Sequence, residues 1–368
     1  MDHHEALGLD RSEFEAALEH FQERTHDGIT YHHLPDYRSR LDRGVVLFDD
    51  AIVPGFPKIP RTLVLSTGIP NHFDEAFSVE EKLNGYNVRI ARVAGRVLAF
   101  TRSGIVCPYT TGVARDTLPV DSFFEAHPKV VLCGEMVGPH NPYTAHEYPE
   151  VDSIGFLAFD VRSRPAGEPM PVRDRRTLLA DWKIPQPELF GYFSPNDAAP
   201  SVRAIIDDLD EAGREGVVMK ATDGTDQLKY TTASANRDDL AFAFSLPFDY
   251  GQAFMFRRLI REAFQAVEWG ESDSLEDRAH ALGEAILFPM VETIETIDTG
   301  ETVGEDHSVR GAPERVEKLL DHLRDMGLHL EIHTDERRDG ERYVEFRKKT
   351  QATNDKTRRY LDGHIVTE

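Results

Sequence analysis

Cysteine is nearly absent from this sequence of 368 residues, which contains only Cys107 and Cys133. Two cysteines without metal-type spacing build no disulfide framework and no zinc site, so we expect both to be buried thiols in a reduced, cytoplasmic protein. Long apolar runs are also absent, because none approaches the roughly 18 residues that span a bilayer. The N-terminal residues lack the basic and apolar parts of a signal peptide. These absences predict a folded, soluble protein with no membrane partner.

Lysine is scarce, whereas acidic residues are abundant. The chain has ten lysines against 32 arginines, and its 65 acidic residues give a formal net charge of −23. An acidic surface repels the phosphates of nucleic acid, which argues against such a partner. We favour a second interpretation, in which the composition is halophilic and keeps the protein soluble in very high salt. At molar salt the Debye length is about 3 Å, so local basic clusters decide what the protein binds.

The pattern of short strands and helices predicts an α+β fold built on antiparallel sheet. The Ala94-Gly95 pair between two alternating segments is a hairpin signal, and further short strands follow it. Shifts in the pattern divide the chain into four parts. We expect a small N-terminal module at 1–70, a main domain built on antiparallel sheet at 71–235, a helical segment at 236–305 and a small, basic α+β C-terminal domain at 306–368.

Several local elements are predicted outside the main domain. In the N-terminal module, Ser12 starts a capping box and Gly28 ends the pattern, which predicts a helix over 12–25. A helix over 251–269 has a wide apolar face that is either core or a dimer surface. A second helix over 275–287 is expected to break at Pro289.

The C-terminal domain combines a helix, a hairpin and a basic tail. Pro313 and Gly327 bracket the helix, and Asp339-Gly340 marks the turn of the hairpin. The tail from Arg337 to Arg359 is the clearest basic cluster of the chain, and we expect it to contact nucleic acid, although it could merely balance the acidic surface.

One stretch, Glu80 to Arg89, has the strongest chemical pattern. Two carboxylates precede Lys82, the chain turns at Asn84-Gly85, and apolar and basic side chains then alternate. This arrangement predicts a lysine at the edge of a turn that leads into a half-buried strand. A lysine at a turn is usually a solvated side chain, so the pattern gains weight only from the residues that follow it.

Those residues come at the ends of successive predicted strands, where they would line one pocket. Together they supply a nucleophile, two carboxylates for a metal, several cations for phosphate and an aromatic ring for a base, which is a set suited to phosphoryl transfer. Singly, each has an ordinary structural explanation as a strand-end carboxylate, a core ring or a solvated cation. The residues are Arg102, Glu135, Phe159, Glu215, Lys220 and Lys229.

In this order, the residues resemble the motifs of the covalent nucleotidyltransferase superfamily of polynucleotide ligases and capping enzymes. Lys82-Leu83-Asn84-Gly85 is similar to the first motif, and Glu135 and Phe159 to the next two. The segment Glu215 to Lys220 and the pair Leu228-Lys229 are similar to the last two. Within the superfamily, the phrase around Lys82 resembles the archaeal ATP-dependent RNA ligase family, and the helical segment and basic C-terminal domain agree with it.

The resemblance implies an enzyme that joins RNA ends in three steps. Lys82 would attack ATP to form a lysyl-AMP intermediate, AMP would pass to an RNA 5′-phosphate, and a 3′-hydroxyl would displace AMP. A lysine is a nucleophile only when it is deprotonated, and nearby cations favour that form, so Lys220 and Lys229 are expected to assist catalysis. The resemblance also implies a homodimer and a role in RNA repair.

The resemblance further implies which residues bind ATP and a metal. Phe159 would stack on adenine, and Glu80 would read its amino group. Arg102 and Asn87 would contact the ribose or 3′-hydroxyl side, together with Lys82, Lys220 and Lys229 at the phosphates. Glu135 and Glu215 would hold Mg²⁺ or Mn²⁺, because hard cations take oxygen ligands.

Two features depart from the family pattern. Asn84 stands where the superfamily usually has aspartate, and the last motif often carries two lysines where this chain has only Lys229.

The chain has 16 histidines, but His3-His4 and His32-His33 lack helical metal-ligand spacing and are expected on the surface.

Three other functions stay open at the level of sequence. A capping-type nucleotidyltransferase would keep Lys82 but use GTP, and a DNA ligase of the same superfamily would seal nicked DNA. A catalytically dead relative would bind nucleic acid without forming an adduct. Labelling with ATP or GTP, and comparison of RNA with nicked DNA, separate these possibilities.

Overall fold

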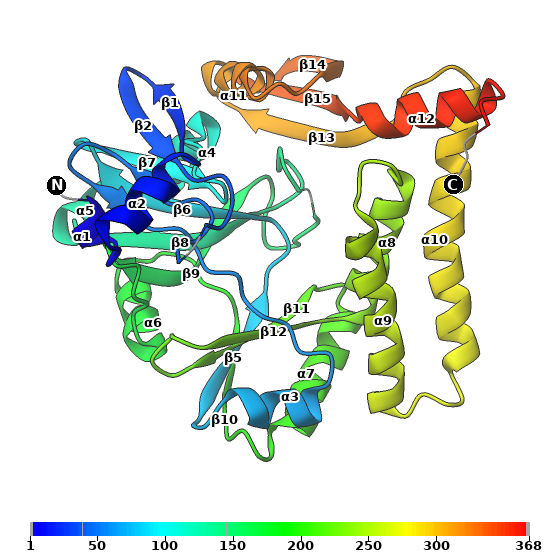
Figure 1. Cartoon of the computed structure of the whole chain (residues 1–368), viewed down its shortest axis with the longest axis horizontal. Helices are drawn as coiled ribbons and strands as arrows, with labels where there is room; N and C mark the ends of the chain where they lie inside the picture. Colours follow the sequence, from blue (N-terminus) through cyan, green and yellow to red (C-terminus); the bar gives the residue numbers. More distant parts are fainter. Residues whose placement is uncertain (1–2, 39, 145, 366–368) are drawn as a thin grey trace.

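A computed structural model describes residues 3–38, 40–144 and 146–365. The described residues form antiparallel sheets flanked by helices, which confirms the predicted α+β class (Figure 1). Both cysteines are buried and free. Among the described residues, no helix has the length and apolar content to cross a membrane. The division of the chain into four parts stays a prediction.

The N-terminal residues form two short helices and a four-stranded sheet, in the order β1-β2-β3-β4. The predicted helix over 12–25 is wrong beyond Leu18. Asp10 forms the capping box with Glu13, and the next residues pair as a hairpin around Asp27-Gly28, where both residues have positive φ. His33 is buried rather than on the surface, and its Nδ1 lies 2.7 Å from the Ser103 carbonyl oxygen. The elements are α1 (His3–Ala6), α2 (Arg11–Leu18), β1 (Gln22–His26), β2 (Ile29–His33), β3 (Val46–Leu47) and β4 (Ile52–Val53).

Two four-stranded antiparallel sheets form the centre of the molecule, and the stretch from Glu80 to Arg89 connects them. The first sheet has the order β7-β6-β8-β9 and the second the order β10-β5-β11-β12. Their strands are β5 (Phe77–Lys82), β6 (Tyr86–Val93), β7 (Arg96–Thr101), β8 (Val130–Val137), β9 (Gly155–Ser163), β10 (Leu189–Phe193), β11 (Gly216–Ala221) and β12 (Gln227–Thr231).

Five helices cover these sheets with apolar side chains. Pro108 begins α4 at a position where its missing N–H costs nothing, and the face of α7 that contains Val202 and Ile206 is buried against β5 and β11. The helices are α3 (Leu65–His72), α4 (Pro108–Thr117), α5 (Val120–Ala126), α6 (Val172–Asp181) and α7 (Ala198–Glu211).

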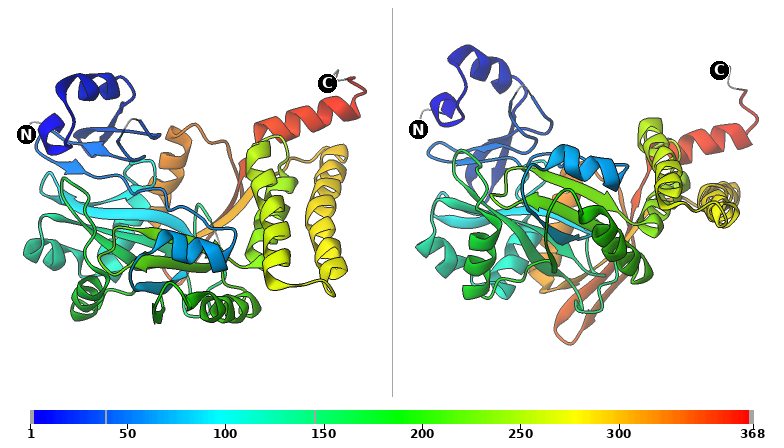
Figure 2. Two further views of the ribbon diagram at one scale, coloured as in Figure 1. Left: turned by 60° about the horizontal axis from the view of Figure 1, so that its bottom comes forward. Right: turned by 90° about the horizontal axis from the view of Figure 1, so that it is seen from below.

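Three longer helices stand at the end of the molecule opposite the N-terminal sheet (Figures 1 and 2). The prediction that Pro289 breaks the second of these helices is wrong, because α10 continues through it. Two contacts beyond the proline hold the helix in place: Thr293 donates a 2.7 Å hydrogen bond to the Ser245 carbonyl, and Ile297 is buried. The helices are α8 (Ala233–Ser245), α9 (Gln252–Trp269) and α10 (Leu275–Asp298).

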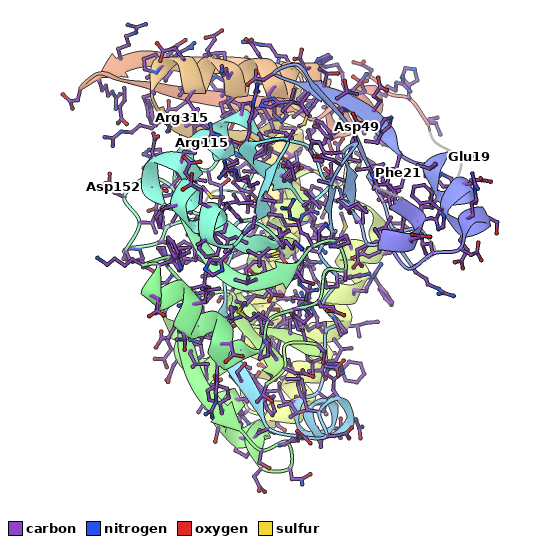
Figure 3. All side chains as sticks on the ribbon, turned by 90° about the vertical axis from the view of Figure 1, so that its left-hand side faces the viewer. Glu19, Phe21, Asp49, Arg115, Asp152 and Arg315 are labelled. Carbon is purple, nitrogen blue, oxygen red and sulfur yellow. The ribbon has the colours of Figure 1, made fainter. Side chains whose placement is uncertain are left out.

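The last residues form a three-stranded sheet, β13-β15-β14, with one helix against it. This α11 packs on α4 (Figure 3). An ion pair between Arg315 and Asp116 joins the two helices. Leu319 and Phe346 share one hydrophobic core with Val88 of β6, so the C-terminal residues complete the core of the central domain. The elements are β13 (Gly304–Gly311), α11 (Pro313–Asp325), β14 (Leu330–Arg338), β15 (Glu341–Lys349) and α12 (Gln351–Leu361).

The basic C-terminal tail is less positive in the fold than its sequence suggests. Arg342 pairs with Asp335 and Glu317, and Arg347 pairs with Asp306. Further pairs hold Arg338, Lys348 and Lys349. The cluster therefore serves largely to balance acidic neighbours, which weakens the expectation that it contacts RNA.

Candidate active site

The turn after Lys82 is held tightly against the neighbouring sheet. A Cβ on Gly85 would fall 2.1 Å from the Met136 carbonyl oxygen, so only glycine lets the turn approach β8 this closely. The backbone N–H of Asn84 donates a 2.7 Å hydrogen bond to the Tyr148 hydroxyl. Lys82 is thereby fixed at the end of β5, facing β8 and Glu135.

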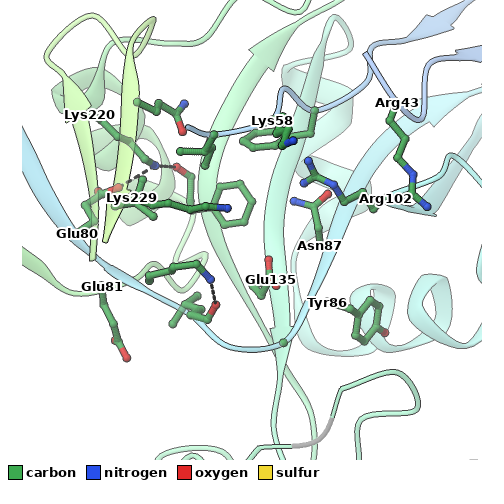
Figure 4. A pocket seen from close by; sticks show the side chains of 18 of the residues that line it. Arg43, Lys58, Glu80, Glu81, Tyr86, Asn87, Arg102, Glu135, Lys220 and Lys229 are labelled. Carbon is green, nitrogen blue, oxygen red and sulfur yellow. Dashed lines mark hydrogen bonds and ion pairs between the residues drawn. The ribbon is translucent and has the colours of Figure 1, made fainter. Parts of the chain in front are cut away.

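A cavity of about 640 Å³ opens between the two central sheets (Figure 4). Eight of the nine residues predicted from the sequence line it, and the ninth, Glu215, contacts Lys82. The structure therefore brings the whole predicted set together. The eight are Glu80, Lys82, Asn87, Arg102, Glu135, Phe159, Lys220 and Lys229.

Lys82 and Glu215 form an ion pair at the centre of the site, with Nζ 2.5 Å from Oε1. The register of β11 places Gly216 opposite Lys82, so Glu215 directly precedes the paired strand. A Cβ on Gly216, whose φ is +141°, would fall 2.3 Å from the Tyr230 carbonyl oxygen, and this requires glycine. The close approach at Gly216 thus places the Glu215 carboxylate against Lys82.

Glu135 belongs to the same electrostatic group. Burial raises the pKa of its carboxyl to about 8, the positive charge of Lys82 opposes the shift, and Glu215 adds to it. Asn87, opposite Glu135 in the pairing of β6 with β8, has a buried Oδ1 with no hydrogen-bond partner among the described residues. The carboxyl and the amide oxygen both lie on the cavity wall, where a bound ligand would complete their contacts.

Glu80 anchors a buried cluster of cations at one end of the cavity. Its carboxylate is 1% exposed and pairs with Arg175, with Arg176 at 3.0 Å and with Lys220 at 2.9 Å. Burial favours the neutral acid, but the charges of Lys220 and Arg175 outweigh it and hold the pKa of Glu80 at about 2. Glu80 is therefore a permanent anion with its charge compensated.

Lys220 links this cluster to Phe159. Its Nζ donates a 2.6 Å hydrogen bond to the backbone carbonyl of Phe159 and lies 5.5 Å from the centre of the Phe159 ring. The ring edge also meets Phe56, with ring centres 5.2 Å apart. The ammonium of Lys220 is thus directed to Glu80 and Phe159, at the end of the cavity where an aromatic face is available.

Lys229 lies between this end and Arg102 (Figure 4). Burial lowers the pKa of Lys229 to about 8, and the positive charges of Lys82 and Arg61 act in the same direction. An amine whose pKa lies near neutral pH changes its charge easily when an anion binds beside it.

A second layer of residues supports Lys82 from behind. Glu81 pairs with Arg214 at 3.5 Å, and Arg214 also lies over the Tyr148 ring, 4.6 Å from its centre. The same guanidinium contacts both oxygens of Glu150 at 2.9 Å. These contacts tie the residues before Lys82 and Glu215 to the segment that holds Asn84.

Glu135 and Glu215 are the two carboxylates that the sequence suggests as metal ligands. Among the described residues, no cluster of three metal-ligating side chains occurs. Glu135 and Glu215 nevertheless lie close enough to raise the pKa of Glu135, which is the repulsion that a divalent cation relieves. One or two carboxylates, completed by water and substrate phosphates, is the usual protein share of a magnesium site. The two residues fit such a cation.

The sequence reasoning missed several cavity residues. Tyr37, Arg43 and Lys58 come from the N-terminal part, and Arg175 and Arg176 reach Glu80 from α6. The scarcity of lysine was a signal for Lys58, in a chain with only ten. No sequence signal pointed to the others, because their contacts depend on the tertiary fold.

Known families and structures match nearly the whole chain. A family described as RNA ligase matches residues 75–233, and one described as Ligase Pab1020 C-terminal region matches residues 242–364. An uncharacterized protein of Methanocaldococcus jannaschii is 38% identical over 339 residues, covering 88% of this chain and 86% of the relative.

Solved structures resemble the chain over almost its full length. A putative ATP-dependent DNA ligase from Aquifex aeolicus has a TM-score of 0.88 at 25% identity, covering 96% of this chain and 99% of that one. An archaeal ATP-dependent RNA ligase has a TM-score of 0.92 at 40% identity, covering 99% of this chain and 98% of that one. The chain therefore belongs to the archaeal ATP-dependent RNA ligase family, within the covalent nucleotidyltransferase superfamily.

Proposed function

We propose that this ligase joins 5′-phosphate and 3′-hydroxyl RNA ends through an AMP adduct on Lys82. The observation that carries the proposal is the position of Lys82. It lies on the wall of a cavity of nucleotide size, in an ion pair with Glu215 and among the cations Arg102 and Lys229. Phosphoryl transfer requires little more from a protein than this positioning and charge stabilisation.

In the first step the neutral amine of Lys82 attacks the α-phosphorus of ATP. A P–N bond forms, the bond to pyrophosphate breaks with its electrons on the leaving oxygen, and the amine loses its proton to solvent. Lys229 and Arg102 face the same cavity and would offset the negative charge that develops on the phosphates.

In the second step an oxygen of the RNA 5′-phosphate attacks the same phosphorus, the P–N bond breaks, and Lys82 recovers a proton. In the third step the RNA 3′-hydroxyl attacks the activated 5′-phosphorus. AMP leaves with the bonding electrons, and the hydroxyl proton passes to solvent. The products are a phosphodiester and AMP.

Adenine would occupy the end of the cavity that contains Phe159 and Glu80. The Phe159 ring offers a stacking face, and Val218 also lines this cavity. The Glu80 carboxylate stays ionised at neutral pH, so it can accept a hydrogen bond from the adenine amino group. Lys220 would hold both residues in place through its contacts with Glu80 and the Phe159 carbonyl.

Asn87 and Arg102 would bind the sugar side of the nucleotide. The unpartnered Oδ1 of Asn87 can accept a hydrogen bond from a ribose hydroxyl. A divalent cation, Mg²⁺ or Mn²⁺, would be held by Glu135 and Glu215 together with substrate phosphates, and when bound it neutralises phosphate charge.

We further propose that the protein is a homodimer that associates through its long helices. Large apolar side chains on one face of α9 and one face of α10 are exposed, among them Phe256 at 61%, Val267 at 82% and Phe288 at 62%. Exposed apolar surface of this kind on a folded chain marks an association site. The same apolar face on a second copy of the chain would cover this surface.

The experiment that tests the function is mass spectrometry of the purified protein after incubation with ATP and a divalent cation. We expect an added mass of AMP on Lys82. Lys82→Ala should abolish the adduct, whereas Lys129→Ala, which removes an exposed lysine outside the cavity, should retain it. An adduct on another residue would refute the assignment.

A second experiment addresses the substrate, because the Aquifex aeolicus neighbour is described as a putative DNA ligase. The protein is incubated with 5′-phosphorylated single-stranded RNA and, separately, with a nicked DNA duplex. We expect joined RNA from ATP and no product from GTP. Sealing of DNA alone would contradict the proposal.

A further inference from the structure

Two cations and a tyrosine from the N-terminal part line the cavity wall across from β5. Tyr37, Arg43 and Lys58 lie outside both regions that match the ligase families, residues 75–233 and 242–364. In Figure 4, Lys58, Arg102 and Arg43 are on one side of the cavity, and Glu80 and Glu81 are on the other. No motif role is assigned to the three N-terminal side chains, so their place in the cavity requires an explanation.

The backbone beside Arg43 is fixed against the central sheet. Gly44 has a φ of +88°, and a Cβ there would fall 2.2 Å from the Arg102 carbonyl oxygen. Arg89, which is fully buried in β6, donates hydrogen bonds to the carbonyls of Gly44 at 2.7 Å and Pro54 at 2.5 Å. Arg43 is therefore held beside Arg102 by backbone contacts that a mobile surface arginine would not have.

Lys58 is carried by residues 54–62, which we call the proline strap. Pro54, Pro57 and Pro60 restrict its backbone, since proline fixes φ. One end of the strap is held by Arg89, and the other pairs with β12, because Lys229 N–H donates to the Pro60 carbonyl at 3.0 Å. Thr62 N–H donates to the Lys229 carbonyl at 3.3 Å. The strap thus crosses the cavity between two anchors.

The charge of the cavity is opposite to that of the whole protein. Among the described residues, six lysines and arginines line it against three carboxylates, in a chain of net charge −23. One of the carboxylates, Glu80, is already compensated by Lys220 and two arginines. The Nε of Arg43 is buried and has no hydrogen-bond partner within the described residues. The surplus of positive charge indicates a polyanionic occupant.

In-line displacement determines where the phosphates of that occupant lie. The attacking and leaving groups at a phosphorus stand on opposite sides. When Lys82 attacks ATP, pyrophosphate leaves on the side away from Lys82. When AMP is transferred, Lys82 is the leaving group, and the RNA 5′-phosphate must enter from that same side. One anion site across from Lys82 can therefore serve both steps in turn.

We infer that Arg43 and Lys58, supported by Tyr37, form this shared phosphate subsite, which binds pyrophosphate in the first step and the RNA 5′-phosphate in the second. The inference rests on the proposed function, because it takes Lys82 as the group displaced in the second step. The shared chemistry is a phosphate group adjacent to the reacting α-phosphate. The N-terminal part is then a component of the active site and not an appended module.

The test compares the wild type with the Arg43→Ala/Lys58→Ala double variant in both directions of the chemistry. Purified enzyme–AMP is mixed with pyrophosphate, and the concentration that gives half-maximal ATP formation is measured. Enzyme–AMP is also mixed with 5′-phosphorylated RNA, and the rate of AMP transfer is measured. In the double variant we expect the half-maximal concentration of pyrophosphate to rise, and the rate of AMP transfer to RNA to fall, each by about tenfold or more. The reason is that each substitution removes a charged partner of phosphate.

Two controls separate the outcomes. Arg11→Ala removes one positive charge from an arginine that is 82% exposed on α2 and should behave as the wild type in both assays. The charge-conserving Arg43→Lys/Lys58→Arg variant should recover most of the loss, which a folding defect of the double alanine variant would not explain. All assays use one salt concentration, since phosphate binding weakens as salt rises.

The results distinguish this inference from the proposed function. If the wild type forms no AMP adduct at Lys82, the proposed function fails. If the wild type forms the adduct and the double variant matches it in either the pyrophosphate or the RNA assay, the shared subsite is refuted. Loss in both assays, with an adduct still formed at saturating ATP, supports it.

Discussion

The charges around Lys82 are determined by individual residues in unequal surroundings. Glu80 and Glu135 are both carboxylates of the cavity, yet the pKa of one is held at about 2 and that of the other is raised to about 8. The difference follows from their partners: Glu80 meets three cations, whereas burial dominates at Glu135 and Glu215 adds a like charge. One acid is thus permanently ionised, and the other is ready to change charge when a cation binds.

This difference predicts a pH-dependent effect of Glu135→Gln. Between pH 4.5 and 8 the folded wild type binds a proton at Glu135 that the unfolded chain releases, so its stability falls as the pH rises. Glutamine has no such proton. We expect the free energy of unfolding of the variant, relative to that of the wild type, to rise by at least about 1 kcal/mol from pH 5 to pH 8, since one pKa unit corresponds to about 1.4 kcal/mol.

Denaturant unfolding at both pH values, without divalent ions and at one salt concentration, measures the effect. Glu150→Gln makes the same substitution at an exposed carboxylate and is the control. An equal difference from wild type at both pH values would contradict the assignment of the raised pKa to Glu135.

The candidate site was largely predictable from the sequence, because its residues lie in strands or directly beside them. Lys82 ends β5 and Glu215 immediately precedes β11, so pairing of those strands brings the two together. Arg43 and Arg175 were not predictable, since neither lies in a local pattern. Arg43 reaches the cavity through the packing of the N-terminal residues, and Arg175 reaches Glu80 through the packing of α6.

At the level of elements, the turn from Leu83 to Gly85 depends on the segment that contains Tyr148. The Tyr148 hydroxyl accepts the Asn84 N–H, and its ring supports Arg214. Neither contact touches the nucleotide cavity directly. Tyr148 is therefore a positioning residue that acts on Lys82 through the turn.

We predict that Tyr148→Phe slows AMP adduct formation by about tenfold while the stability changes by only about 1 kcal/mol, the net value of one hydrogen bond. The loss should appear in kcat with little change in KM for ATP, because the adenine end is untouched. Rapid-quench kinetics and thermal unfolding measure the two effects. An unchanged kcat, or a change confined to KM, would show that the turn does not need this contact.

Elements with strong local signals were predicted well, and those decided by competing signals were not. The hairpins β6–β7 and β14–β15 and the helix α9 follow their turn residues and apolar periodicity. The segment from Gln22 to His26 matched a helical pattern, but pairing across Asp27-Gly28 makes it a strand. Helix α10 survives Pro289 because tertiary contacts on its last turns outweigh the lost hydrogen bond.

At the scale of the whole molecule, the long helices and the catalytic cavity lie at different places in the fold. The exposed apolar faces of α9 and α10 contribute no residue to the cavity among the described residues. Substitutions on these faces therefore leave the residues that line the cavity unchanged. The acidic surface elsewhere opposes association at low salt and less so at high salt.

We predict that Phe288→Glu converts a dimer into a monomer and leaves adduct formation at Lys82 within about twofold of wild type, because Phe288 is 62% exposed and remote from the cavity lining. Light scattering with size-exclusion chromatography measures the mass, and Arg11→Ala is a matched surface control. A wild-type protein that is monomeric at all concentrations would contradict the dimer.

The core shared by β6, α4 and the C-terminal residues has a consequence for how the protein is made. Tyr86 and Val88 belong to the same cluster as Leu319 and Phe346, which are separated from them by more than half of the chain. During synthesis the face of α4 that receives α11 stays open to water until α11 itself has left the ribosome. The core beside the sheet that follows Lys82 is completed only then. A nascent chain therefore passes through a stage in which Lys82 is present and the core beside it is unfinished.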